Sequence, residues 1–525
     1  MADGSRTSPE ERVHPAWARY AMPSAADLIF ITLLVLLVFT PLSVRLLGDA
    51  GIGWHIRAGQ QILAMHSIPR LDRFSSTMNG KPWFAWEWLY DVLVGGLERA
   101  AGLNGVVLFT ALIIAGVFAW AFRLLMTRGT SLPLAVVLLL LAASASMIHF
   151  FARPHVLSWL LTLACFAVLD STERCSLDPR SHERGWLLWL LPPLMLVWVN
   201  VHGGFVVGFV LIAIFLISAT WQWHRAGEGK FDEFLLRLGA AKRARDLTLV
   251  GVVAAAATLA NPYGFKLHVH VYRYLSNRFL MDHIDEFQSP NFHGVAQKCF
   301  AGLLLITLIA LAARVRELRL SETLVVLFAA YSGLYASRNI PVASLLLILA
   351  AGPILTRAIE RIISADFSAR MERIESALQG HLSPVAAIVL ACWIAANGGK
   401  LGATPLMTAH FDAKRFPVAA VDYLEGHQTT GPVLSPDYWG GYLIYRRAPK
   451  ALVVADDRHD LYGENFFKSY LKMVHVEPGW DELLLRYNVN CLVVPKDSPL
   501  ANMLGEAPGW KAIYADDVAI IFSRR

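Results

Sequence analysis

Polar and ionisable side chains gather in seven segments that lie beside long apolar runs. They comprise Asp49, Trp54, His55, Arg57, Trp86, Glu87, Trp88, Asp91, Arg153, His155, Asn200, His202, Asn261, Tyr263, His268, His270, Asp285, Glu286, Gln288, Arg338 and Asn339. Such groups are costly next to hydrocarbon and usually mark a site. The carboxylates can exchange protons, and a guanidinium fork can bind an anionic phosphate. We expect the seven segments to converge on one polar cleft.

Several of these segments have a structural alternative. Trp86 and Trp88 can anchor a helix at the membrane interface, and Arg338 can snorkel from a helix end to the surface. The pair Gly203-Gly204 suits a tight turn with positive φ. Residues 266–278 suit either an amphipathic helix lying on the membrane or a basic lip that attracts phosphate.

The elements that position these groups are predicted to be membrane-spanning helices. Of the 525 residues 55% are hydrophobic and 17% charged, and the mean hydropathy is +0.46, which excludes an ordinary soluble protein. About eleven spans are expected. They are Leu28–Leu47, Val106–Arg123, Leu134–Ile148, Val156–Leu169, Trp186–Val199, Phe205–Trp221, Leu247–Leu259, Phe300–Ala313, Thr323–Ala336, Ile340–Leu355 and Pro384–Ala396.

The distribution of Lys and Arg predicts the orientation of the chain. The cluster from Arg225 to Arg245 places its connection, and with it the N-terminus, on the cytoplasmic side of a cell (inner) membrane. The net charge of +6 is explained by basic loops, and no basic block interleaved with aromatics indicates nucleic-acid binding. The five Cys residues are scattered, so we infer neither a disulfide framework nor a zinc site.

Three parts are expected along the chain. Residues 1–27 form a cytoplasmic segment, residues 28–397 form the membrane domain with large external loops at 48–104 and 261–298, and residues 398–525 lie outside. In the last part helical patterns alternate with short apolar strands, including Ala451–Ala455 and Cys491–Pro495. This alternation predicts a small external, periplasmic α/β domain.

Several strings of residues together resemble a known family. They are Gly53-Trp54-His55-Ile56-Arg57-Ala58-Gly59, Ser67-Ile68-Pro69-Arg70-Leu71-Asp72-Arg73-Phe74-Ser75, Pro82-Trp83-Phe84-Ala85-Trp86-Glu87-Trp88-Leu89, Trp198-Val199-Asn200-Val201-His202-Gly203, Asn261-Pro262-Tyr263-Gly264, Glu286-Phe287-Gln288-Ser289-Pro290, Arg338-Asn339-Ile340-Pro341, Trp439-Gly440-Gly441-Tyr442-Leu443 and Asp457-Arg458-His459-Asp460-Leu461-Tyr462-Gly463. In this order they resemble bacterial multi-spanning proteins of the glycosyltransferase C (GT-C) superfamily. The likeness covers most of the chain and belongs to a largely uncharacterised branch, so it implies the fold more directly than the substrate.

The resemblance implies a membrane hexosyl- or pentosyltransferase. Such an enzyme moves a sugar from a polyprenyl-phosphate donor to a glycan, lipid or protein acceptor on the outer face, with an acid of the first external loop as base. The relatives carry that acid next to the Trp-His pair, where this chain has Gly51-Ile52-Gly53. The base is therefore Asp49, Glu87 or Asp91, or this member is inactive.

The remaining candidates are assigned by the same resemblance and by their chemistry. Those for the donor phosphate are His55, Arg57, Arg153, His202, Arg338 and Asn339. Those lining the substrate are Trp54, Trp86, Asn200, Tyr263, Glu286 and Gln288, and those of the external domain are Trp439, Asp457, Arg458, Asp460 and Tyr462. No metal triad is legible, although Asp456, Asp457 and Asp460 suit either a divalent metal ion or a solvated turn. Two other classes stay open, a lipid or glycan transporter and a non-catalytic accessory or scaffold protein.

Overall fold

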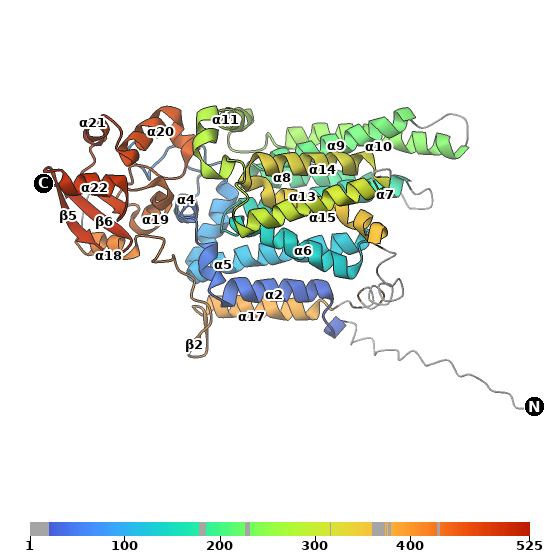
Figure 1. The fold of residues 1–525 in the computed structure, drawn as a ribbon, viewed down its shortest axis with the longest axis horizontal. Helices are drawn as coiled ribbons and strands as arrows, with labels where there is room; N and C mark the ends of the chain where they lie inside the picture. Colours follow the sequence, from blue (N-terminus) through green and yellow to red (C-terminus); the bar gives the residue numbers. More distant parts are fainter. Residues whose placement is uncertain are drawn as a thin grey trace, which may run out of the picture.

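The computed structural model describes residues 20–177, 185–225, 231–314, 317–359, 373, 375, 378, 380–427 and 431–525. Most of the chain is a bundle of helices that run side by side (Figure 1). These are α2 (Ala25–Phe39), α3 (Leu42–Leu46), α5 (Trp88–Thr127), α6 (Leu132–Ser146), α7 (His155–Leu177), α8 (Leu191–Val201), α9 (Phe205–Arg225), α10 (Phe231–Ala257), α13 (Val295–Arg314), α14 (Leu320–Tyr335), α15 (Ile340–Ile359) and α17 (Leu382–Ala396).

Six helices among the described residues are long and apolar enough to cross a membrane. By length and composition these are Trp88–Thr127, Leu132–His149, His155–Ser176, Phe205–Arg225, Val295–Ala313 and Ser337–Ile359. Four shorter apolar helices lie among them: Ala25–Phe39, Gly185–Val201, Leu320–Tyr335 and Leu382–Ala396. A polytopic helical membrane protein is therefore confirmed, whereas the number of eleven spans stays a prediction.

Several predicted spans have different bounds in the structure, as in α10, which begins at Phe231 and not at Leu247. Two further cases have a clear physical reason. The first does not run on to Leu47, because α2 ends at Phe39 and the short α3 follows Pro41. Proline lacks an N–H group and disfavours a helical residue before it, and Thr40 is extended accordingly. The span predicted over Val106–Arg123 lies in the second part of α5, which consists of two helical parts joined at the non-helical Ala101 and Gly102, and the first part begins at Trp88.

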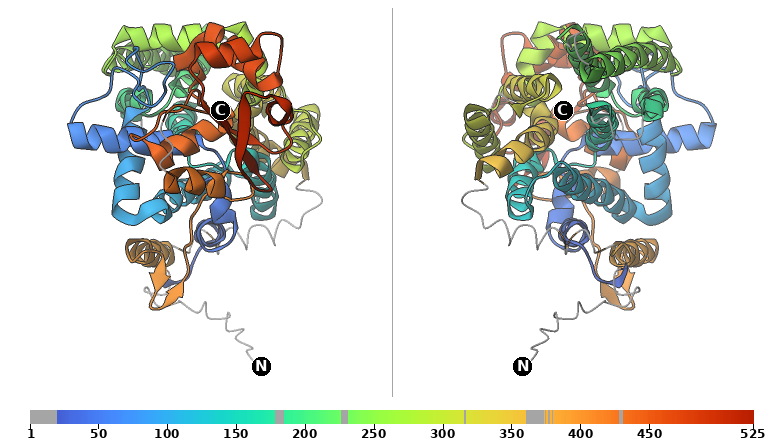
Figure 2. Two further views of the ribbon diagram at one scale, coloured as in Figure 1. Left: turned by 90° about the vertical axis from the view of Figure 1, so that its left-hand side faces the viewer. Right: turned by 90° about the vertical axis from the view of Figure 1, so that its right-hand side faces the viewer.

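The C-terminal part gathers at one end of the bundle, and Figure 2 shows it facing the viewer in the left panel. Strands β3 (Val433–Leu434), β4 (Cys491–Pro495), β6 (Ala519–Arg524) and β5 (Trp510–Ala515) form a sheet in that order. Strand β3 pairs parallel with β4, and the other pairs are antiparallel. Helices α18 (Val418–Gly426), α19 (Asp437–Arg447), α20 (His459–His475), α21 (Trp480–Arg486) and α22 (Pro499–Glu506) accompany it, and a ribbon of β1 (Lys400–Leu401) and β2 (Thr404–Pro405) precedes it. We call residues 418–525 the outer unit and residues 48–87 the first external segment, and both names follow the predicted orientation.

The first external segment, with α4 (Gly51–Met65), packs directly on the outer unit. The predicted strand Ala451–Ala455 is reduced to isolated bridges, in which Val453 pairs with both Ser75 and Val433. The N–H of Ser76 donates to the carbonyl of Val453 at 2.8 Å, and the N–H of Val453 donates to the carbonyl of Phe74 at 3.1 Å. The short edge of the sheet is thus completed by the external segment.

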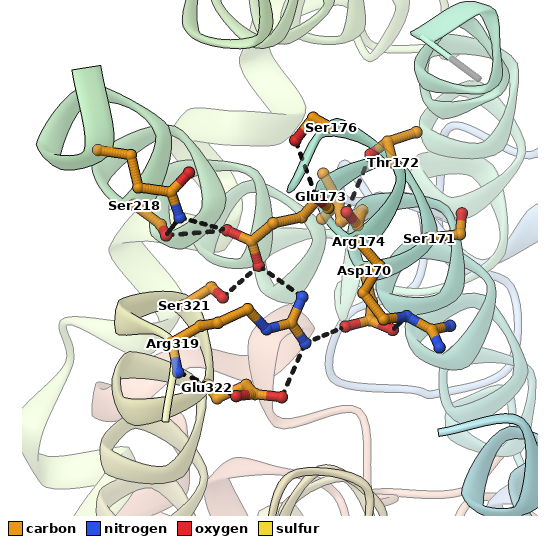
Figure 3. A network of polar contacts seen from close by, with 12 residues as sticks. Asp170, Ser171, Thr172, Glu173, Arg174, Ser176, Ser218, Arg319, Ser321 and Glu322 are labelled. Carbon is orange, nitrogen blue, oxygen red and sulfur yellow. Dashed lines mark hydrogen bonds and ion pairs between the residues drawn. The ribbon is translucent and has the colours of Figure 1, made fainter. Parts of the chain in front are cut away.

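A buried polar network joins the helices at the end of the bundle remote from the outer unit (Figure 3). Glu173 of α7 is enclosed, and it accepts from Ser218 of α9 at 2.9 Å and pairs with Arg243 of α10 at 3.1 Å. Arg319, at the start of α14, bridges Glu173 at 3.1 Å and Asp170 at 2.7 Å. Because buried charges must be paired, this network fixes which helices lie together.

Candidate active site

A cavity of about 1010 Å³ opens between the bundle and the outer unit. The predicted site residues that line it are Asp49, Trp54, Trp86, Glu87, Asp91, Arg153, His202, Glu286, Arg338, Asn339, Asp457, Arg458 and Asp460. They come from segments spread over more than four hundred positions of the chain. The structure therefore brings many of the predicted polar residues, from both parts of the chain, into one cleft.

Glu87 lies on the cavity wall between two imidazoles. Its Oε2 atom is 3.8 Å from Nε2 of His55, and its Oε1 atom is 3.8 Å from Nε2 of His202. Burial lowers the pKa of His55 well below its usual value and lowers that of His202 to about 3, so both rings are neutral at pH 7. Burial likewise raises the pKa of the Glu87 carboxyl to about 8. Glu87 is thus a carboxyl group poised to exchange a proton near neutral pH.

Hydrogen bonds set the orientation of both rings. Nδ1 of His55 and Oδ1 of Asp91 share a hydrogen bond of 2.6 Å, which turns Nε2 of His55 toward Glu87. Nδ1 of His202 accepts from the N–H of Gly204 at 3.0 Å and from the Ser158 hydroxyl at 2.8 Å, so its Nε2 carries the proton. Glu87 therefore faces a ring N–H donor at His202.

Glycines at the bend after α8 serve close packing. Neither Gly203 nor Gly204 has positive φ, so the expectation of a left-handed turn is wrong. A Cβ atom on Gly203 would lie 2.8 Å from Cζ3 of Trp86, and one on Gly204 would lie 2.8 Å from Nδ1 of His202. Gly203 lets the segment before α5 approach the bend and so brings Glu87 to His202, whereas Gly204 makes room for Ser158 and the His202 ring.

A second group of charges centres on Arg153. Its Nη1 atom is 3.1 Å from Oδ1 of Asp49 and 2.6 Å from Oδ2 of Asp457. Asp49 also accepts from the N–H of Gly51 at 2.8 Å, at the start of α4, and Trp54 donates from Nε1 to Asp457 at 3.0 Å. Burial raises the pKa of Asp457 to about 6, even though Arg153 works to lower it. Asp49 is thereby engaged by a cation, whereas Glu87 is not.

Arg338 and Glu286 form a third polar pair on the cavity wall. Nη1 of Arg338 lies 3.1 Å from Oε1 of Glu286, and the guanidinium carbon lies 4.4 Å from the Phe287 ring centroid. Burial works to raise the pKa of Glu286, but Arg338 lowers it to about 2. Arg338 therefore pairs with Glu286 of the same chain and does not only extend toward the membrane surface.

Arg458 borders the cavity but is held by the protein. It donates to Asp456 at 2.8 and 2.7 Å and to Asp72 of the first external segment at 2.8 Å. Burial works to raise the pKa of Asp72, and Arg458 keeps it low. Tyr462 also donates to Asp456, at 2.8 Å. These residues tie the outer unit to the external segment.

Several predicted site residues lie outside the cavity lining, namely His55, Arg57, Asn200, Tyr263, Gln288, Trp439 and Tyr462. Apart from His55, which backs Glu87, they have structural partners. Arg57 donates to the carbonyl of Tyr445 at 2.7 Å, Asn200 accepts from Trp88 at 2.8 Å, Tyr263 accepts from the N–H of Ala85 at 2.8 Å, Gln288 donates to the carbonyl of Met281 at 2.8 Å and Trp439 donates to the carbonyl of Arg415 at 2.9 Å. Direct contact of Arg57 with a donor phosphate in this cavity is therefore not supported.

The cavity also has polar residues that sequence reasoning missed. Asp437, His459 and Tyr470 line its outer wall, where Oδ2 of Asp437 lies 2.9 Å from Nε2 of His459 and Oδ1 accepts from the Tyr470 hydroxyl at 3.1 Å. Ser158 and His149 line its inner wall. His459 belongs to the string Asp457-Arg458-His459-Asp460, so the sequence could have predicted it. Asp437 and Tyr470 lie in no motif whose spacing points to a site.

The three carboxylates considered for a divalent metal ion do not converge. Asp456 binds Arg458, Asp457 binds Arg153, and Asp460 lies 3.0 Å from Nε2 of His270. Within the described part of the chain, no group of three His, Cys, Asp or Glu residues is arranged to hold a metal ion. These residues therefore do not fit a resident metal site.

Solved structures of another protein have the same fold. The oligosaccharyltransferase of Archaeoglobus fulgidus, tethered with an acceptor peptide containing the NVT sequon, has a TM-score of 0.54 at 12% identity, over 95% of this chain and 73% of that chain. The same archaeal enzyme, AglB, in complex with an inhibitory peptide and a dolichol-phosphate, has a TM-score of 0.53 at 11% identity, over 95% and 74%. No protein-family model and no curated protein sequence matches. The expected resemblance is confirmed at the level of the fold: this chain is a membrane protein with the same fold as this archaeal oligosaccharyltransferase.

Proposed function

We propose that this protein is a membrane glycosyltransferase that moves a sugar from a polyprenyl-phosphate donor to an acceptor hydroxyl or amide on the outer face of a cell membrane. The observation that carries the proposal is the Glu87 carboxyl, buried on the wall of the cavity between two neutral histidines with a pKa of about 8. The matched fold supports it, because one AglB structure holds a dolichol-phosphate and another an acceptor peptide.

Glu87 is the base in this proposal, in preference to Asp49 and Asp91. Asp49 is held by Arg153 and by the N–H of Gly51, which both bind its Oδ1 atom. Asp91 is enclosed and its Oδ1 is taken by His55. Glu87 lies within reach of the cavity without a cation on it, so it can accept the proton of an acceptor.

The reaction balances as a single displacement. The acceptor oxygen or nitrogen attacks C1 of the sugar, its proton passes to Glu87, and the bond between C1 and the phosphate oxygen breaks. The electron pair of that bond leaves with polyprenyl phosphate, which gains negative charge. Arg153 is placed to stabilise that charge, and Arg338 adds a second guanidinium to the same cavity.

The experiment uses purified full-length protein in lipid nanodiscs. A panel of polyprenyl-phosphate-linked hexoses and pentoses is supplied with glycan, lipid and peptide acceptors, and donor consumption is followed by mass spectrometry. Wild-type protein is expected to consume one donor, and Glu87→Gln is expected to lower the rate by about 10²-fold or more. Glu506→Gln, at an exposed position of α22, is the matched control and is expected to leave the rate unchanged.

Other outcomes identify the alternatives. Loss of transfer in Asp49→Asn with full activity in Glu87→Gln would assign the base to Asp49. Absence of consumption across the panel by folded wild-type protein would overturn the transferase proposal. The accessory protein and the lipid or glycan transporter would then remain, and movement of the labelled lipid between leaflets would distinguish them.

A further inference from the structure

Two carboxylates from distant parts of the chain meet at one nitrogen atom. Asp49 precedes α4 and Asp457 precedes α20, yet an oxygen of each lies within 3.1 Å of Nη1 of Arg153. Carboxylate oxygens that converge on one point are also the usual ligands of a divalent cation. In this cleft a guanidinium stands at that point.

The backbone makes room for this arginine. A Cβ atom on Gly51 would overlap Nη1 of Arg153 and crowd Oδ2 of Asp457, so glycine is required where the guanidinium lies. The position is next to the first residue of α4, where the positive end of the helix dipole disfavours a cation. Asp49 offsets this by accepting from both Gly51 and Arg153. Helix stability alone does not explain an arginine at this place.

The Arg153 guanidinium has N–H donors left for a ligand. Both carboxylate contacts use Nη1, and Nε and Nη2 have no hydrogen-bond partner among the described residues. Arg458 differs, because Nε, Nη1 and Nη2 each donate to a carboxylate. Arg153 lines the cavity, and it is the cation that most strongly lowers the pKa of Glu87, so its charge acts where the reaction would occur. A phosphate can accept two hydrogen bonds from such a fork.

We propose that Arg153 takes the place of a divalent cation in this cleft and binds the phosphate of the lipid directly, with Asp49 and Asp457 holding the guanidinium. The inference rests on the proposed function for its ligand, a polyprenyl phosphate. A divalent ion at the same carboxylates would lie within a few ångströms of a fixed positive charge and be repelled by it. Phosphate binding is therefore independent of added metal ions.

The first test measures binding of polyprenyl phosphate without a sugar, in nanodiscs, with EDTA or with Mg²⁺. The dissociation constant of wild-type protein is expected to agree within about twofold in the two conditions. Arg153→Gln is expected to weaken binding by about tenfold or more, and Arg153→Lys, which keeps the charge but not the fork, by less. Arg73→Gln, at an exposed position of the same external segment, is the matched control and is expected to bind as wild type does.

The second test asks whether the carboxylates accept a metal once the arginine is gone. Electron paramagnetic resonance of Mn²⁺ is expected to show no bound ion in wild-type protein, a bound ion in Arg153→Ala, and none in the double variant Arg153→Ala/Asp49→Asn. Loss of lipid binding on EDTA treatment, or Mn²⁺ bound by wild-type protein and released by Asp457→Asn, would overturn the inference. So would a failure of Arg153→Ala to bind Mn²⁺ while its melting transition matches that of wild type.

Neither test requires sugar transfer. Wild-type protein that binds polyprenyl phosphate in EDTA but consumes no donor would overturn the transferase proposal and leave the inference on Arg153 intact. A transferase whose phosphate binding needs Mg²⁺ would do the reverse.

Discussion

At the scale of single residues, the chemistry of the cleft depends on what surrounds Glu87. A carboxyl group in water has lost its proton at pH 7, but this one is enclosed and its two nearest polar neighbours are neutral imidazoles. Hydrogen bonds with Asp91 and Ser158 fix those imidazoles, so the environment of Glu87 is set by three layers of side chains. Asp49, by contrast, meets a guanidinium and is the weaker candidate for a base.

The pH dependence of transfer follows from this environment. The pKa of Glu87 is raised to about 8, and a base acts only when it has lost its proton. The rate at saturating donor is therefore expected to fall about tenfold per pH unit below pH 8 and to level off above it. A pH–rate profile measures this, and a profile that is flat from pH 6 to pH 9 would rule out Glu87 as the base.

The same burial affects stability. The folded protein holds a proton on Glu87 that the unfolded chain releases above its ordinary pKa of 4.5, so Glu87 lowers the free energy of unfolding as the pH rises from 4.5 to about 8. Glu87→Gln is therefore expected to raise the free energy of unfolding at pH 8 by about 2–4 kcal/mol while lowering transfer by about 10²-fold or more. Thermal melts at pH 5 and pH 8 check this, since the gain in the variant should be small at pH 5. An equal gain at both pH values would contradict the explanation.

At the scale of helices, the network of Figure 3 shows how buried ion pairs fix the positions of neighbouring helices relative to one another. Glu173 receives Arg243, Arg319, Ser218 and Ser321 from three other helices. Removing its charge would leave the two arginines short of a partner in a buried place, which is costly.

Glu173→Gln is expected to lower the free energy of unfolding by about 3–5 kcal/mol. Asp246→Asn is the matched control, because Asp246 pairs with a largely exposed arginine on the same helix as Arg243, and it is expected to cost less than about 1 kcal/mol. Denaturation in detergent or nanodiscs, followed by circular dichroism, measures both. Equal effects of the two substitutions would show that the network does not hold the helices in their relative positions.

Sequence patterns predicted elements better than their ends. The apolar run Val106–Arg123 predicted the second part of α5. The first part, from Trp88, has apolar residues at helical spacing, such as Leu89, Leu93 and Leu97, but it lies within the predicted loop 48–104 and is separated from that run by the non-helical Gly102. Pro41 indicates the break after Phe39, because proline disfavours a helical residue before it. The role of Gly203 could not be predicted from the sequence, because its close packing against Trp86 is a tertiary contact.

At the scale of the whole molecule, the cleft exists because the outer unit and the first external segment close on each other. The carboxylate–arginine group joins Asp49, Arg153 and Asp457, and no local pattern relates positions so far apart. The sequence predicted that polar residues would converge on the outer face. It did not reveal which of them pair, and so did not distinguish a base from a residue that holds an arginine.

The outer unit and the first external segment are in direct backbone contact where α19 meets the start of α4. A Cβ atom on Gly441 of α19 would overlap the carbonyl oxygen of Ala50, and one on Gly53 of α4 would overlap the carbonyl oxygen of Gly441. Any side chain at position 441 must therefore move α19 away from the start of α4. That start carries Asp49 and faces Arg153, so a shift of about 1 Å there would reach the cavity directly.

Gly441→Ala is accordingly expected to destabilise the contact by about 1–3 kcal/mol and to lower transfer at least about tenfold. Hydrogen–deuterium exchange is expected to rise in peptides covering 50–60 and 437–447, while the exchange of strands β4 and β6 stays low because the sheet keeps its own core. Gly426→Ala is the matched control: it lies on α18 of the same unit, a Cβ atom there meets open space, and alanine favours the helix. Unchanged exchange and activity in Gly441→Ala would mean that the two parts tolerate separation, and the cleft would then have to form by closure around its ligand.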